Sequence, residues 1–313
     1  MPEPRPILIA GPTASGKSAL ALALAEQLGG TVINADSMQV YRELRLLTAR
    51  PSAEDEARAP HALYGCISAA EAYSAGRYAA DAARTIAEAR AAGRVPIVVG
   101  GTGLYFKALL EGLSPIPAAD PAVRAHWRGE AACRPAAELH ALLRERDPEM
   151  AARLMPTDSQ RIVRALEVLD STGRSLADWQ RQPGRPVLDE ADAAKLLILP
   201  DRASHGALID ARLDAMLAGG ALDEVRGLVA AGLSGELPVM RALGVAPLAA
   251  HLRGALSLEA AAAAAKSDTR KYAKRQLTWL RRNMITWKTI STQQMTNFIR
   301  RDVSLILDGV DRS

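Results

Sequence analysis

The stretch ILIAGPTASGKS, residues 7–18, decides the fold of this 313-residue chain. Its apolar start, 7–10, is typical of a buried strand, and the alanine-rich and leucine-rich segment 19–28 that follows it is typical of a helix. Between them stands the pattern G-x-x-x-x-G-K-[ST], in which backbone amides, the amino end of the helix and a lysine together bind phosphate groups. A turn that only capped a helix would not need the lysine and the hydroxyl in this register. The predicted phosphate-binding residues are Gly11, Thr13, Ala14, Ser15, Gly16, Lys17 and Ser18.

Ser18 is the predicted metal ligand of this loop. Mg²⁺ prefers oxygen ligands and is usually shared between the protein and the phosphates of a substrate. We therefore expect Mg²⁺ to bind between Ser18 and the bound phosphates. The loop alone leaves open whether those phosphates belong to a nucleotide or to another diphosphate.

Strands and helices alternate through the first third of the chain. The segments 31–35 and 95–99 are short, apolar and β-branched, and an amphipathic segment from 74 to 92 lies between them. Continuous apolar strands separated by helices are typical of a parallel sheet that is covered on both faces. The predicted fold class is therefore α/β, a P-loop NTPase-like parallel sheet core flanked by helices. Ligands bind at the carboxyl ends of such strands, which brings the segments 36–39 and 100–105 to the phosphate loop.

A second, all-helical domain is predicted as an insertion over residues 116–194. It begins after a proline-containing linker and carries no convincing strand. The apolar segment 195–200 then returns the chain to the sheet. The catalytic core is therefore predicted to be discontinuous, comprising 1–115 and 195–313, and its last residues are weakly patterned.

Asp36 and Thr102 are candidate catalytic residues at the two other strand ends. The carboxylate of Asp36 could act as a general base, orient a nucleophile or assist Mg²⁺, or it could cap the turn that follows. The turn Gly100-Gly101-Thr102 stands where ordinary P-loop ATPases and GTPases carry an acidic residue that secures the metal. Its glycines would let the backbone approach the ligand closely, although a plain tight turn would have the same sequence.

Basic side chains concentrate near the carboxyl end of the sequence. The segment 266–288 should form one helix that carries eight cations against the single acid Asp268, together with Tyr272, Trp279 and Trp287. Six of the cations form two stripes at helical spacing: Arg270, Lys274 and Arg281, and Lys271, Arg275 and Arg282. Such a stripe can follow a polyanion backbone, although basic, solvated helix faces are common.

Composition narrows the class of protein further. Hydrophobic residues make up 49% of the chain, so a folded core is expected, and no apolar run reaches the ~18 residues of a membrane span. The cysteines, Cys66 and Cys133, are far apart, and the five histidines form no metal-binding pair. A reducing, cytoplasmic location is expected. The run Asp170-Ser-Thr-Gly173 reads as a helix end rather than a GTPase switch, because no N-K-x-D run accompanies it.

Five motifs occur together, in the order GPTASGKS, NADSMQVY, VVGGTGLY, QRIVRALEV and RKYAKRQLTWLRRN. With them the chain, over roughly residues 5–288, resembles the bacterial tRNA dimethylallyltransferases, also called tRNA isopentenyltransferases. The resemblance implies transfer of the dimethylallyl group of dimethylallyl diphosphate to N6 of the adenosine 3′-adjacent to the anticodon in tRNA. The implied partners are the tRNA anticodon stem-loop and dimethylallyl diphosphate, with no membrane and no obligate protein partner.

The resemblance also implies roles for the candidate catalytic residues. Asp36 would accept the proton of the amine, while Lys17, the loop amides and Mg²⁺ on Ser18 would take up charge on the departing diphosphate. Thr102 matches a family threonine that meets both the diphosphate and the target nucleotide, and Arg212 matches an arginine that clamps the phosphates. The base would have to leave the loop stack to reach these groups.

The RNA contacts that the resemblance implies come from three regions. They are Asp36, Ser37, Met38, Gln39 and Thr102 around the base, Arg124, Gln160, Arg161, Ile162, Val163 and Arg164 in the helical domain, and Arg270, Lys274 and Arg275 on the basic helix. The run RALGVAP, 241–247, departs from the family's Gly-Tyr-Arg-Gln-like run and lacks its aromatic residue and second arginine. A small-molecule P-loop kinase and an RNA-stimulated NTPase remain as alternatives, and the non-acidic turn at 100–102 argues against both.

Overall fold

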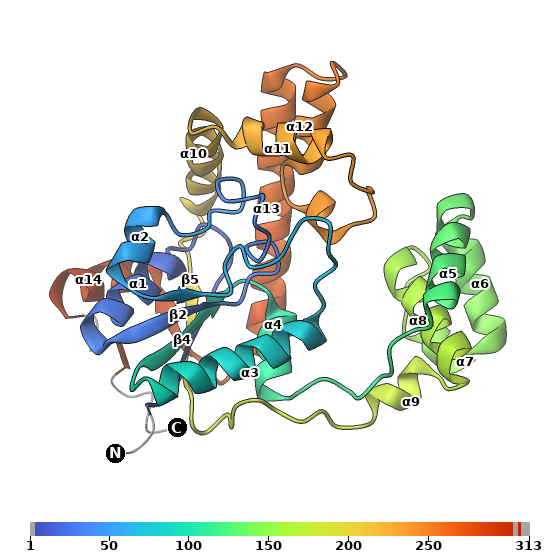
Figure 1. Cartoon of the computed structure of the whole chain (residues 1–313), viewed down its shortest axis with the longest axis horizontal. Helices are drawn as coiled ribbons and strands as arrows, with labels where there is room; N and C mark the ends of the chain where they lie inside the picture. Colours follow the sequence, from blue (N-terminus) through green and yellow to red (C-terminus); the bar gives the residue numbers. More distant parts are fainter. Residues whose placement is uncertain (1–3, 303–305, 308–313) are drawn as a thin grey trace. The chain divides into compact units, whose positions relative to one another are not determined.

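The structure is a computed structural model that describes residues 4–302 and 306–307. The chain divides into two compact units (Figure 1). The first, called the core unit here, comprises Met1–Leu110 and Val187–Ser313, and the second, the helical unit, comprises Glu111–Pro186.

Six parallel strands form the sheet of the core unit, in the order β3-β2-β4-β1-β5-β6. The strands are β1 (Ile7–Ala10), β2 (Gly30–Asn34), β3 (His61–Ala62), β4 (Val95–Gly100), β5 (Ala194–Leu199) and β6 (Lys288–Ser291). The predicted parallel α/β core is confirmed. Because β1 lies between β4 and β5, the phosphate loop that follows it starts from the interior of the sheet.

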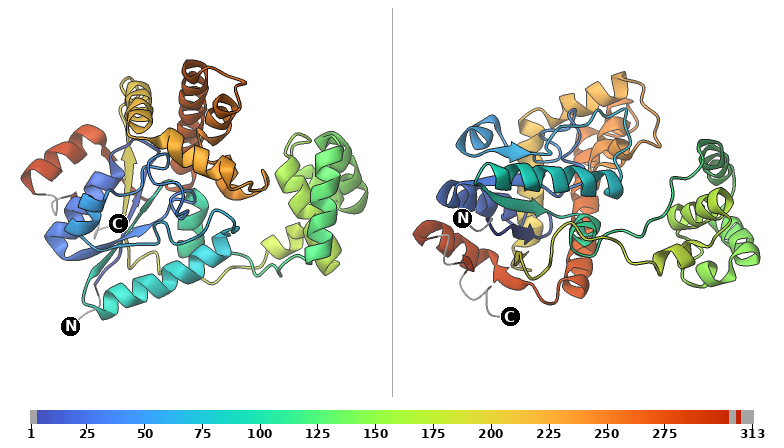
Figure 2. Two further views of the ribbon diagram at one scale, coloured as in Figure 1. Left: turned by 45° about the horizontal axis from the view of Figure 1, so that its top comes forward. Right: turned by 60° about the horizontal axis from the view of Figure 1, so that its bottom comes forward.

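Alternate residues of each strand point to opposite faces of the sheet, and each face has its own apolar core. Ile7 and Ile9 pack in the core that includes α1 and α14, whereas Leu8 and Ala10 pack in the core that includes α3, α4 and α10 to α13. The helices around the sheet can be followed in Figures 1 and 2. The helices of this unit are α1 (Lys17–Leu28), α2 (Ala53–Arg58), α3 (Ala75–Ala91), α4 (Gly103–Leu110), α10 (His205–Ala218), α11 (Ala221–Ala230), the 3₁₀ turn η1 (Pro238–Arg241), α12 (Val245–Leu252), α13 (Leu258–Asn283) and α14 (Thr292–Arg301).

The carboxyl-terminal segment, described above as weakly patterned, forms both a strand and a helix. β6 pairs with β5, and α14 begins with a capping box in which Ser291 and Gln294 bond reciprocally. Met295, Phe298 and Ile299 then pack in the core around α1. A four-residue strand is too short to show a periodicity, but the S-x-x-Q capping box was a readable signal for the helix.

The basic helix begins before the predicted segment 266–288 and also ends before it does. α13 ends at Asn283, so Trp287 and Lys288 lie outside it and the prediction that it carries them is wrong. Trp287 instead packs edge-on against Phe106, with ring centroids 5.4 Å apart. A buried aromatic contact of this kind competes with continuation of the helix.

The helical unit has a separate apolar core formed by Trp127, Leu139, Leu143, Ile162 and Leu166, among others. Its helices are α5 (Pro121–Cys133), α6 (Ala136–Arg146), α7 (Pro148–Ala152), α8 (Ser159–Thr172) and α9 (Leu176–Gln180). The D-x-x-G run is confirmed as a helix end: Gly173 caps α8 with a φ of 66°, and the Asp170 carboxylate accepts a bond from Trp127 Nε1 at 2.8 Å.

None of the helices within residues 4–302 is both long enough and apolar enough to cross a bilayer. Both cysteines are free and exposed. The described part of the chain also brings together no group of three or more His, Cys, Asp or Glu side chains suited to a metal ion.

Candidate active site

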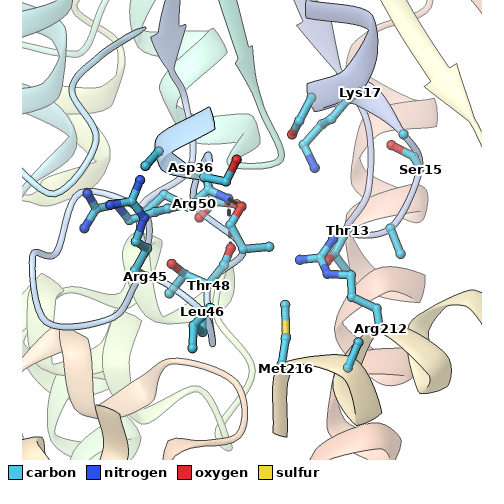
Figure 3. Close-up of a pocket in the computed structure, with 18 residues that line it drawn as sticks. Thr13, Ser15, Lys17, Asp36, Arg45, Leu46, Thr48, Arg50, Arg212 and Met216 are labelled. Carbon is cyan, nitrogen blue, oxygen red and sulfur yellow. Dashed lines mark hydrogen bonds between the residues drawn. The ribbon is translucent and has the colours of Figure 1, made fainter. Parts of the chain in front are cut away.

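A cavity of about 690 Å³ opens at the carboxyl ends of β1 and β2 (Figure 3). Its wall is built by the phosphate loop, by the turn after β2, by residues 45–53, which are called the pocket loop here, and by α10. The lining residues are Thr13, Ala14, Ser15, Gly16, Lys17, Ser18, Asp36, Gln39, Arg45, Leu46, Thr48, Ala49, Arg50, Ser52, Ala53, Arg212, Ala215 and Met216. Six of the seven predicted phosphate residues, all except Gly11, thus share one cavity with Asp36 and Arg212.

Two left-handed residues shape the phosphate loop, Ala14 with a φ of 57° and Gly16 with a φ of 83°. A Cβ at Gly16 would stand 2.4 Å from Cε of Met295 in α14, so a larger residue there would displace the end of that flexible side chain, and the positive φ itself favours glycine. Ser15 is buried, and within the described residues its hydroxyl has no hydrogen-bond partner. A hydroxyl without a hydrogen-bond partner, in a loop that begins a helix, is suited to bind a phosphate oxygen.

Lys17, which is buried, and Arg212, which is partly buried, place two positive charges beside the carboxylate of Asp36. Burial lowers the pKa of Lys17 from 10.5 to about 8, with the charge of Asp36 acting in the opposite direction and that of Arg212 in the same one. Burial also lowers the pKa of Arg212, against the effect of Asp36. Within the described residues, Lys17 Nζ donates to the carbonyl oxygen of Pro12 alone, at 3.2 Å. Two cations that are partly or fully shielded from water and close to one carboxylate form a site that favours a multiply charged anion.

Asp36 both caps a turn and lines the cavity. Its Oδ1 accepts from the Met38 amide at 2.9 Å. Within the described residues its Oδ2 has no hydrogen bond and is available to the cavity. Asn34, which is fully buried, fixes the backbone of Asp36 by accepting from its amide at 2.8 Å and donating to its carbonyl at 2.9 Å. The carboxylate is therefore oriented from both sides.

Thr102 lies against the segment that follows β2. Its Oγ1 accepts from the Ser37 amide at 3.0 Å and donates to the Ser37 hydroxyl at 3.3 Å, and its amide donates to the Ala35 carbonyl at 3.2 Å. The structure therefore brings Thr102 next to Ser37 and, through it, next to Asp36. It does not place Thr102 in the lining of the cavity.

The glycines beside Thr102 make room for the protein itself rather than for a ligand, which corrects the expectation above. A Cβ on Gly100 would stand 2.0 Å from the carbonyl oxygen of Ala35, and one on Gly101 would stand 2.3 Å from Nε2 of Gln276. The close approach that glycine permits is thus used to join β4 to the end of β2 and to α13.

Gln276 and His205 hold the phosphate loop, although neither belongs to the predicted site. Gln276 Oε1 accepts from the Thr13 amide at 3.0 Å, and its Nε2 donates to the Gly101 carbonyl at 2.9 Å. A ring nitrogen of His205 lies 2.8 Å from the Thr13 carbonyl oxygen. Gln276 could have been noticed as a polar residue on the buried stripe of α13, between Ala273 and Leu280.

Gln276→Leu is expected to lower the free energy of unfolding by about 1 kcal/mol, because it leaves the partly buried amide of Thr13 without an acceptor. We also expect the affinity for inorganic diphosphate to fall about tenfold, since the loop loses its tie to α13. Chemical denaturation and calorimetric titration measure the two effects. Thr278→Ala, whose hydroxyl bonds only within α13, is the matched control. Equal behaviour of the two variants would contradict this role of Gln276.

Gln39 and Met38, predicted to line the pocket of the target base, have structural contacts of their own. Gln39 Nε2 donates to the carbonyls of Thr48 and Ala49, at 2.8 and 3.0 Å, so it supports the pocket loop. Met38 packs partly buried against the larger apolar core.

In the helical unit only some of the predicted RNA residues present their side chains to solvent. Ile162 and Val163 lie in the apolar core of that unit, with 0% and 9% of their surface exposed, so their side chains offer little surface to a partner and their contact with RNA stays a prediction. Arg161 is exposed and pairs with Asp158 at 3.2 Å, while Arg164 reaches the buried Glu167 at 3.4 Å. Arg124 and Gln160 are exposed.

The two basic stripes of α13 border two different grooves. One groove, of about 340 Å³, also involves α10, and it is lined by Arg202, Arg270, Lys274 and Arg281, among others. The other, of about 590 Å³, is lined by Lys271, Lys274, Arg275, Thr278, Trp279, Arg282 and Asn283. Arg270 is paired with Asp210, whereas Lys274 and Arg275 form no ion pair within the described residues. The helix therefore keeps unpaired positive charge beside Trp279.

Two family models match this sequence. The model described as IPP transferase matches residues 39–283, and the model described as Isopentenyl transferase matches residues 5–66. The tRNA dimethylallyltransferase of Parvibaculum lavamentivorans is 54% identical over 316 residues, with 100% of each chain covered. That of Methylobacterium nodulans is 58% identical over 293 residues, covering 93% of this chain and 96% of the relative.

Solved structures with the same fold carry related names. The tRNA isopentenylpyrophosphate transferase of Bacillus halodurans matches with a TM-score of 0.67 at 30% identity, covering 98% of this chain and 97% of the other. A eukaryotic dimethylallyltransferase, captured in crystallographic snapshots while acting on tRNA, matches with a TM-score of 0.81 at 25% identity, covering 96% of this chain and 77% of the other.

Proposed function

This chain belongs to the tRNA dimethylallyltransferase family, and we propose that it transfers the dimethylallyl group of dimethylallyl diphosphate to N6 of the adenosine 3′-adjacent to the anticodon. The single observation that carries the proposal furthest is the convergence of Lys17, Arg212 and Asp36 on one cavity. A buried and a partly buried cation suit a diphosphate, and a carboxylate beside them suits a base that takes a proton from the attacking amine.

The rest of the cavity supports a prenyl diphosphate over a nucleoside triphosphate. Leu46, Ala49, Ala53, Ala215 and Met216 add an apolar portion to the lining, next to the phosphate loop. A prenyl group needs such a surface and a nucleotide needs polar partners for its base and sugar. The turn after β4 also lacks the acidic residue that kinases and NTPases of this fold use for their metal.

The reaction exchanges one carbon–oxygen bond for one carbon–nitrogen bond and transfers one proton. The adenine N6 bonds to the first carbon of the prenyl group, the bond from that carbon to the diphosphate oxygen breaks, and the N6 proton passes to Asp36. Lys17, Arg212 and the loop amides stabilise the negative charge that collects on the leaving diphosphate. The bond from the Met38 amide to Asp36 orients the carboxylate while leaving its second oxygen for the proton. Thr102 holds the Ser37 segment beside it.

The oxygen donors of the cavity fit Mg²⁺. Ser18 presents a hydroxyl at the start of α1, and Asp36 presents a carboxylate in the same cavity. These are hard oxygen ligands, and a diphosphate would supply the remaining ones. When bound there, Mg²⁺ would neutralise charge on the diphosphate.

The RNA partner is proposed to be the anticodon stem-loop. Arg124, Gln160, Arg161 and Arg164 on the helical unit, and Arg270, Lys274 and Arg275 on α13, are the proposed contacts, because cations on helix surfaces bind RNA phosphates. Ser37, Met38 and Gln39 would border the unstacked base. The free, exposed cysteines agree with a reducing cytoplasm, where we place the protein.

Mass analysis of the RNA product tests this proposal. Anticodon stem-loop RNA incubated with the protein, Mg²⁺ and dimethylallyl diphosphate is expected to gain one prenyl unit on the target adenosine. An RNA with guanosine at that position has no N6 amine and should remain unmodified. Phosphorylation of a small molecule by ATP, or RNA-stimulated release of phosphate from ATP, without prenylation, would replace this function with one of the alternatives.

A further inference from the structure

Glu224 of α11 contacts three successive backbone amides at the start of the pocket loop. Its Oε1 accepts from the amides of Arg45 and Leu46, at 2.9 and 2.6 Å, and its Oε2 accepts from that of Leu47 at 3.0 Å. Consecutive amides that point at one anion form a nest, an arrangement that often binds a negatively charged ligand. Here the protein supplies the anion itself, and within the described residues Glu224 forms no ion pair with a cation.

The backbone that Glu224 holds leads directly into the lining of the cavity. Leu46 is 38% exposed and belongs to that lining, together with Thr48 and Ala49. Ala49 adopts a φ of 55°, a conformation that a residue with a Cβ keeps only when its surroundings hold it. Gln39 supports the same stretch through the carbonyls of residues 48 and 49. The loop is therefore held through its amides by Glu224 and through its carbonyls by Gln39.

Glu224 also links the pocket loop to α11, the helix that directly follows α10, and α10 forms another wall of the cavity. α10 supplies Ala215 and Met216, and only Gly219 and Gly220 separate it from α11, which carries Glu224. Leu46 from the loop and Met216 from α10 are the two large apolar side chains of the cavity (Figure 3). Displacing the loop from α11 would change the space between them.

We propose that Glu224 is a positioning residue that sets the space between Leu46 and Met216, and thereby both the affinity for the prenyl diphosphate and the preference for a short prenyl chain. The inference rests on the function proposed above. It adds to that function a residue that touches neither substrate and acts only through the backbone of the pocket loop.

Glu224→Gln tests the proposal, because glutamine has nearly the same size but turns an N–H donor toward a nest of N–H donors. Hydrogen exchange at the amides of residues 45–47 is expected to become about 100-fold faster. By calorimetry with Mg²⁺, the Kd for dimethylallyl diphosphate should rise about tenfold and the Kd for the stem-loop RNA should stay within about twofold. The ratio of the Kd for geranyl diphosphate to that for dimethylallyl diphosphate should fall several-fold.

Asp223→Asn is the matched control, since Asp223 is the adjacent acid of α11, pairs with Arg226 and does not contact the loop. It should leave exchange and both Kd values unchanged. Amides at 45–47 that stay protected in Glu224→Gln would overturn the inference, and so would an unchanged ratio of the Kd for geranyl diphosphate to that for dimethylallyl diphosphate. The proposed function would still stand in either case if the wild-type protein transfers the dimethylallyl group. Wild-type protein that neither binds nor transfers the dimethylallyl group would overturn both.

Discussion

Asp36→Asn is expected to slow transfer of the dimethylallyl group about 10²- to 10⁴-fold, the usual contribution of a general base. Asparagine keeps an oxygen in the place of Oδ1, so the bond from the Met38 amide and the turn are preserved, but the side chain no longer takes a proton. Single-turnover assays with saturating RNA and dimethylallyl diphosphate measure the chemical step. The affinity for RNA should stay within a few-fold of the wild-type value.

Asp36→Ala removes both the base and the hydrogen bond that caps the turn, so its comparison with Asp36→Asn distinguishes the two roles. It should abolish transfer as well, and in addition it should lower the free energy of unfolding by about 1 kcal/mol through loss of the turn's hydrogen bond. If Asp36→Asn transferred at the wild-type rate, Asp36 would be a turn residue alone. If it transferred slowly only because RNA binding was lost, the carboxylate would belong to RNA recognition.

Lys17→Met is expected to abolish transfer and at the same time to stabilise the unliganded protein. Burial lowers the pKa of Lys17 from 10.5 to about 8. At about 1.4 kcal/mol for each tenfold change in proton binding, holding the charge costs the folded state roughly 3 kcal/mol at pH 7. Methionine removes that cost and keeps the volume. Removal of a buried cation that stabilises the leaving diphosphate should cost at least about 10³-fold in kcat/KM.

The pH dependence of stability checks the sign of this prediction. Between pH 8 and pH 10.5 the unfolded chain binds more protons at Lys17 than the folded protein does, so the stability of the wild type should rise with pH through that window. Chemical denaturation at pH 7 and pH 10 should show the advantage of Lys17→Met shrinking accordingly. Lys271→Met, at an exposed position on α13, should show no such dependence. A less stable Lys17→Met at pH 7 would refute the argument.

The local sequence pattern was enough to predict those strands, loops and helices that are determined by neighbouring residues. The strand, the loop and the helix around Lys17 follow each other within one short stretch, and the strand ends at Asp36 and Thr102 follow from the rule that parallel strands end at one edge. The same rule could not predict that Ala35 and Gln276 occupy the space where side chains at positions 100 and 101 would stand, because that requires the positions of distant elements.

The residues that escaped prediction act across long separations in sequence. Gln276 reaches Thr13, and Glu224 reaches the pocket loop, through contacts that no local periodicity contains. Ile162 and Val163, although predicted as RNA contacts, are buried for a related reason. A motif is a contiguous run, whereas a helix turns successive side chains to different sides, so part of any helical motif lies in the core.

The phosphate loop depends on Gln276, which lies 263 residues beyond Thr13 along the chain. Sheet strands β1, β2 and β4 can begin to associate early, but the nascent chain lacks the acceptor of the Thr13 amide until α13 has been synthesised. Fragments that stop before α13 would accordingly carry the whole phosphate-loop motif and yet bind diphosphate poorly.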